Sequence, residues 1–94
     1  MIVKKKENIV ARSVHGTSFL IDISDKYSGD KCAIYEMNET GMFLWNNIDG
    51  IRSVEDLALL LKAAIIDDID YQVIYDDVFE FINSIITGKF VEVL

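Results

Sequence analysis

The chain has 94 residues, of which 51% are hydrophobic, and its formal net charge is −7. This length predicts a single domain over residues 1–94 with one hydrophobic core. The single cysteine, Cys32, excludes an internal disulfide and a multi-cysteine metal site. The negative charge argues against nucleic acid as a partner, because proteins that bind it neutralise phosphates with Lys and Arg. The basic cluster Lys4–Lys6 lies at a terminus that we expect to be mobile.

The sequence predicts neither secretion nor insertion into a membrane. The N-terminus is charged at Lys4–Lys6, and no apolar segment of the kind found in signal peptides follows it. The longest apolar run is far shorter than the roughly 20 residues that a membrane-spanning helix requires. We therefore expect a cytoplasmic protein.

The first third of the chain predicts three strands. Residues 9–14 and 18–24 are rich in β-branched and aromatic side chains, and His15-Gly16 between them indicates a tight turn. Residues 31–36 predict a third strand, although apolar side chains occur on both of its faces. Connections this short produce an antiparallel meander. In the second strand, Phe19, Ile21 and Ile23 are expected to line one face, with Asp22 and Ser24 on the other.

A short helix over 39–48 is the most aromatic segment of the chain. Asn38 is expected to cap its start, because an asparagine side chain can accept hydrogen bonds from the free N–H groups of the first turn. Gly50 is expected to end it, because glycine readily takes the left-handed conformation. We interpret Trp45 as a core residue.

Two further helices and a strand follow. Ser53 and Asp56 predict a capping box at the start of a helix over 53–66, and the apolar periodicity of 71–87 predicts a third helix. The alternating residues 89–94 predict a terminal strand. Three strands, three helices and one short strand predict an α+β fold of the winged helix-turn-helix type.

The predicted helix over 71–87 has an unusually wide apolar face. One cluster on this face comprises Ile74, Val78, Phe81, Ile82 and Ile85. The face is extended by Tyr75, Phe79 and Ile86. A helix that contacts only one core needs a narrower face than this. Either another element or a partner is therefore expected to cover the remainder.

Nothing in the sequence indicates a catalytic or metal site, and we expect no cofactor and no enzymatic activity. His15 lies in a predicted turn, and Cys32 has no histidine at a recognisable spacing that could act as its base. The aspartates of residues 67–70 lack the glycine and the bidentate glutamate of a calcium loop. We interpret them as an acidic loop.

From residue 37 onward the chain resembles the PqqD family, whose members are also called RiPP recognition elements. Each motif alone is largely capping and core, and the resemblance rests on their order and spacing. The matching segments are Met37-Asn38-Glu39-Thr40-Gly41, Leu44-Trp45, Ile48-Asp49-Gly50, Ser53-Val54-Glu55-Asp56-Leu57-Ala58, and Asp77-Val78 with Phe81.

The resemblance implies a non-catalytic peptide chaperone of natural product biosynthesis. Such a protein binds the leader segment of a ribosomally made precursor peptide and presents it to a modifying enzyme, often a radical SAM enzyme or, in lasso-peptide pathways, a leader protease. In the family the leader pairs as an extra strand with the third strand and packs against the third helix. The residues that this implies here are Cys32, Ala33, Ile34, Tyr35, Glu36, Met37, Tyr75, Phe79 and Ile86.

Two alternatives remain open from the residues. A winged-helix transcriptional regulator would need a basic recognition helix, but residues 71–87 contain no Lys or Arg, and 53–66 contains only Lys62. A structural subunit of an enzyme complex would use the same apolar edge as a permanent interface. Genes that encode a precursor peptide and a modifying enzyme beside this one would favour the leader-binding hypothesis.

Overall fold

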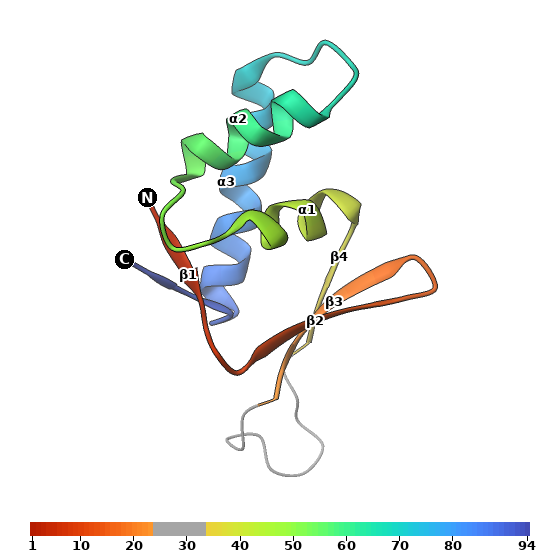
Figure 1. Cartoon of the computed structure of the whole chain (residues 1–94), viewed down its shortest axis with the longest axis vertical. Coiled ribbons are helices and arrows are strands. Elements are labelled where there is room, and N and C mark those ends of the chain that lie inside the picture. Colours follow the sequence, from red (N-terminus) through yellow and green to blue (C-terminus); the bar gives the residue numbers. More distant parts are fainter. Residues whose placement is uncertain (24–33) are drawn as a thin grey trace.

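The computed structural model describes residues 1–23 and 34–94 (Figure 1). Its helices gather at one end and its three-stranded sheet extends from the other. Within these residues the elements are, in chain order, β1 (Val3–Lys5), β2 (Ile9–Val14), β3 (Thr17–Asp22), β4 (Ile34–Met37), α1 (Glu39–Asn47), α2 (Val54–Ala64), α3 (Tyr71–Thr87) and β5 (Val91–Val93). The predicted α+β fold is confirmed.

β2, β3 and β4 form an antiparallel sheet with β3 in the centre. β2 and β3 are joined by the predicted tight turn, in which His15 and Gly16 both have positive φ. β4 pairs with β3 so that Met37 lies opposite Ser18 and Tyr35 lies opposite Leu20. The order leaves β2 and β4 as the two edges of this sheet.

The apolar face predicted for the second strand is not the buried face of β3. The buried residues are Ser18, Leu20 and Asp22, whereas Ile23 is exposed and Phe19 and Ile21 are only half-buried. Asn8 Nδ2 donates a hydrogen bond of 2.6 Å to Asp22 Oδ1, and the Ser18 hydroxyl lies 2.9 Å from that of Ser13. Polar side chains with such partners can be buried. Apolar character alone therefore did not identify the buried face.

The N-terminus is held in place, so the expectation of a mobile basic end is also wrong. β1 pairs antiparallel with β5, and Val3 is only 2% exposed. The backbone N–H of Leu94 donates to the carbonyl of Ile2 at 2.9 Å, which brings the two ends of the chain side by side (Figure 1). Lys5 places its ammonium 5.0 Å from the centre of the Trp45 ring, and burial there lowers the pKa of Lys5.

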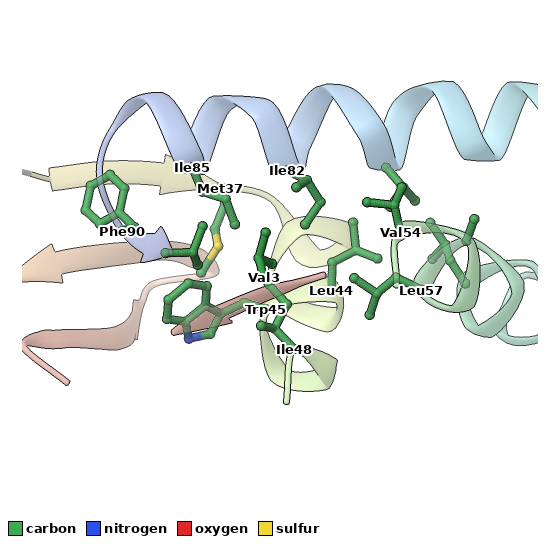
Figure 2. Packing of buried hydrophobic residues seen from close by; sticks show 14 of the residues in the cluster. Val3, Met37, Leu44, Trp45, Ile48, Val54, Leu57, Ile82, Ile85 and Phe90 are labelled. Atoms are coloured by element: carbon green, nitrogen blue, oxygen red, sulfur yellow. The ribbon is translucent and has the colours of Figure 1, made fainter. Parts of the chain in front are cut away.

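α1 fills the centre of the core. Asn38 caps it as predicted, because its side chain accepts a hydrogen bond of 2.9 Å from the N–H of Gly41. Trp45 is 4% exposed, and Figure 2 shows it within the cluster of buried side chains beneath α3. The helix ends at Asn47, so Gly50, although it has the positive φ of 80°, turns the following loop and does not close the helix.

α2 and α3 pack on α1. The capping box predicted for α2 is present, with the Ser53 hydroxyl accepting from the Asp56 N–H and the Asp56 carboxylate accepting from the Ser53 N–H. α3 runs from Tyr71 to Thr87 as predicted and buries Ile82 against the core. None of the helices in the described ranges is both long and apolar enough to cross a bilayer.

Candidate functional site

The direction of the main-chain groups in the sheet follows from its first turn. A two-residue turn makes Val14 and Thr17 a hydrogen-bonded pair, and such pairs alternate with pairs that share no main-chain bond. In this alternation Ala11 directs its carbonyl away from β3. Arg12 agrees with this, because its Nη1 donates to the Ala11 carbonyl at 2.8 Å. The guanidinium thus occupies part of the β2 edge.

On the other edge, the same alternation leaves main-chain groups unpaired. The residues of β3 that point toward β4 are Ser18 and Leu20, which lie opposite Met37 and Tyr35. Ile34 and Glu36 therefore direct their N–H and C=O groups to the free side of β4. Among the described residues, neither has a main-chain hydrogen-bond partner outside the sheet. This open strand is called the β4 edge below.

A cleft of about 370 Å³ lies between the β4 edge and α3. One wall is residues 35–38 of β4 and its end. The inner end is formed by residues of α1 and α2, which are Thr40, Gly41, Leu44 and Leu61. The wall on α3 is formed by Asp77, Val78, Glu80, Phe81 and Ser84. We call this space the β4 cleft; Glu36, one of the two residues with unpaired outward groups, lies on its strand wall.

Aromatic contacts set the spacing between the two walls of the β4 cleft. The rings of Tyr35 and Phe81 meet edge to face, with centroids 6.2 Å apart, and Tyr35 also lies 6.0 Å from the ring of Phe90. At the inner end, a Cβ on Gly41 would lie 2.8 Å from the Met37 Cβ and 3.2 Å from the Phe81 ring. Glycine at this position therefore lets α1 approach both walls.

The charged side chains that line the β4 cleft are all acidic. They are Glu36 on the strand wall and Asp77 and Glu80 on α3, and all three are exposed. No described side chain forms an ion pair or hydrogen bond with these carboxylates. The salt bridge found among the described residues joins Arg52 and Asp49, which lie outside the cleft. Within the described ranges, no group of three His, Cys, Asp or Glu side chains could hold a metal ion.

The structure brings four of the predicted site residues together on β4. Ile34 is 61% exposed and Glu36 is exposed, whereas Tyr35 is half-buried and Met37 is buried. Tyr35, Glu36 and Met37 line the β4 cleft. Cys32 and Ala33 lie outside the described residues.

The predicted contacts on α3 lie elsewhere. Tyr75 and Phe79 stack on each other, with ring centroids 6.0 Å apart, and Ile86 is half-buried against the core. None of the three lines the β4 cleft, and at about 100° per residue they lie on the flank of α3 opposite Asp77. Their contact with a peptide remains a prediction. Instead, the cleft is lined by other residues of α3, which the sequence did not identify as site residues. They are Asp77, Val78, Glu80, Phe81 and Ser84.

The family profile of coenzyme PQQ synthesis protein D (PqqD) matches residues 27–91, which is more than half of the chain. The chain belongs to the PqqD family. The resemblance drawn from the motifs after residue 37 is thereby confirmed. The matched residues include β4 and all three helices. Both walls of the β4 cleft therefore lie within the region that matches the PqqD profile.

Two solved structures share the fold of this PqqD-family chain. The first, TbiB1 in complex with the TbiA(beta) leader peptide, has a TM-score of 0.73 and 12% identity over 97% of this chain and 96% of that one. The second, lasso peptide synthetase B1 complexed with the leader peptide, has a TM-score of 0.74 and 14% identity over 99% of this chain and all of that one. No curated protein matches the sequence.

Proposed function

We propose that this protein binds the leader segment of a ribosomally made precursor peptide, as an extra strand on the β4 edge, and presents it to a modifying enzyme. The observation that carries the proposal is the β4 edge itself, an edge strand whose outward main-chain groups have no partner among the described residues and which lies directly beside a cleft. Unpaired N–H and C=O groups on an edge strand are a template for another chain. A peptide that pairs with them gains main-chain hydrogen bonds whatever its sequence.

The β4 cleft supplies the contacts that would distinguish one leader from another. Successive side chains of a strand point to opposite faces, so every second residue of the added strand would face the side on which Tyr35 and Met37 lie. Those residues would meet Phe81 on the opposite wall. The intervening residues would lie beside Ile34 and Glu36 on the exposed face of β4.

The comparisons support this proposal at the level of family and fold. The chain belongs to the PqqD family, and both structural neighbours are described as complexes with a leader peptide. We infer that the chain itself is not an enzyme and that its partner carries out the chemistry. The partner classes that the family resemblance implies are a radical SAM enzyme and a leader protease.

The charge of the helices argues against the alternative of a DNA-binding winged helix. α3 has no Lys or Arg, and the one Lys of α2, Lys62, donates from its Nζ to the carbonyl of Ile69 at 2.7 Å. Phosphate binding depends on available cations. A recognition helix for nucleic acid would therefore have to bind with acidic side chains toward the phosphates.

Amide hydrogen exchange tests the proposal directly. Linear peptides selected on the protein from a phage-displayed library would be added to labelled protein, and exchange would be followed residue by residue by NMR. We expect the amides of Ile34 and Glu36 to become protected, because within the described part of β4 these are the two that point away from β3. The amide of Ala11, which points outward on the β2 edge, is the control. Protection at Ala11, or none at Ile34 and Glu36 with peptide bound, would contradict the proposal.

A further inference from the structure

We propose that the leader segment bound in the β4 cleft is cationic, with Lys or Arg placed between the apolar residues that face Phe81. This inference rests on the proposed function and specifies the class of peptide. It follows from the charges that line the cleft, which are those of Glu36, Asp77 and Glu80. No Lys, Arg or His is among the lining residues.

The three carboxylates lie on both sides of the path that an added strand would take. Glu36 is on β4, where its main-chain groups face the peptide. Asp77 and Glu80 are three residues apart on α3, so both face the same side of the helix. A peptide strand between these walls would have negative charge along both of its margins.

The carboxylates of Glu36, Asp77 and Glu80 have no hydrogen-bond or ion-pair partner within the described part of the chain, whereas the carboxylate of Asp49 does. Asp49 accepts hydrogen bonds from the N–H groups of Ile51 and Arg52 and pairs with the Arg52 guanidinium. An acidic leader would bring further negative charge to a cleft whose carboxylates have no described cation beside them. Lys and Arg avoid this, because their charge is opposite in sign to that of the carboxylates, and their long side chains let the charged ends reach along the margins of the strand.

Net charge alone would favour any cationic peptide, so the experiment must separate the cleft from the rest of the surface. The test variant is Asp77→Asn combined with Glu80→Gln. The matched control is Asp67→Asn combined with Asp68→Asn, which changes net charge equally in the exposed loop before α3. Thermal melting would verify that both double variants remain folded.

The probes are linear peptides selected from a phage-displayed library, each synthesised also with its Lys and Arg replaced by Gln. We expect the selected peptides to be enriched in Lys and Arg. Their affinity should fall about five- to tenfold on the test variant and change less than about twofold on the control. On the wild-type protein, the Gln peptides should bind as weakly as the cationic peptides bind the test variant.

The possible failures are distinguishable. Neutral or acidic peptides that protect the Ile34 and Glu36 amides, and whose affinity the test variant leaves unchanged, would overturn the charge inference and leave strand addition intact. An equal loss of affinity on the control variant would also overturn it, since the effect would then belong to net charge. Peptides that bind without protecting these two amides would overturn the proposed function and this inference together.

Discussion

The two edges of the three-stranded sheet differ in what lies beside them. On the β2 edge, the side chain of Arg12 donates a hydrogen bond to the outward carbonyl of Ala11 and so covers part of the main chain. On β4, the outward main-chain groups of Glu36 lie beside a cleft with α3 as the opposite wall, and those of Ile34 continue the same edge. Edge strands that are not used for binding are commonly protected by charged side chains. The difference therefore indicates which edge is available for a partner strand.

The largest expected effect concerns the core that both parts of the molecule share. Trp45→Ala should lower the free energy of unfolding by about 3–5 kcal/mol, because it leaves a cavity in a core with few spare side chains. Denaturant unfolding followed by circular dichroism measures this loss. Trp45→Phe, which keeps an aromatic ring, should cost less. A loss below about 1 kcal/mol would mean that Trp45 does not support the core.

Proline substitutions distinguish the inner from the outer side of β4. Tyr35→Pro removes an N–H that points to β3 and should destabilise the domain by about 3 kcal/mol or more. Ile34→Pro removes an outward N–H, so the circular dichroism spectrum should be retained while affinity for a selected peptide falls at least about tenfold.

Ala11→Pro is the matched control, because it removes an outward N–H from the β2 edge. Its effect on peptide affinity, measured by fluorescence anisotropy, should be within about twofold. If Ile34→Pro stays folded and binds a selected peptide as tightly as the wild type, strand addition at β4 is wrong.

The two flanks of α3 provide a finer comparison. Phe81→Ala removes a ring from the β4 cleft and should weaken peptide binding by about tenfold, in line with about 1–2 kcal/mol for a partly buried aromatic contact. Phe79→Ala removes the same group from the opposite flank and should change affinity little. Isothermal titration calorimetry measures both. The reverse result would favour the sequence-based prediction that Tyr75, Phe79 and Ile86 contact the peptide.

The smallest expected effect concerns the protected edge. Arg12→Ala should change the stability of the monomer by less than about 0.5 kcal/mol, because the side chain is exposed. It should, however, increase self-association, since the Ala11 carbonyl is then free to pair with another chain. Sedimentation at increasing concentration measures this, with Arg52→Ala as a control of equal charge change. Identical sedimentation of the two variants would show that Arg12 does not protect the β2 edge.

The sequence predicted best what local interactions determine. The Asn38 cap, the capping box at Ser53 and Asp56, and the length of α3 all depend on residues within one or two turns of each other. The burial of Asp22 was missed because it depends on Asn8, which is 14 residues away. The pairing of β1 with β5 was missed because each strand is short and its partner is at the other end of the chain.

The candidate site was predictable in part for the same reason. The family resemblance pointed to the third strand, and the structure places Ile34 and Glu36 outward on it. The flank of α3 that faces this strand was not predictable, because apolar residues extend to both sides of the helix. Phe81 belongs to the central apolar cluster of the sequence pattern and Phe79 to its extension, and neither position shows which flank meets β4. Only the packing of Tyr35 against Phe81 distinguishes the two flanks.

The pairing of β1 with β5 has a consequence for the order of folding. It closes a loop of nearly the whole chain and gains only three pairs of residues. Because the entropy cost of closure increases with loop length, we expect this pairing to form after the helices have packed and to open first. The segments that build the β4 cleft all lie between residues 35 and 84. Fraying of the two ends would therefore be a partial unfolding that leaves the cleft assembled.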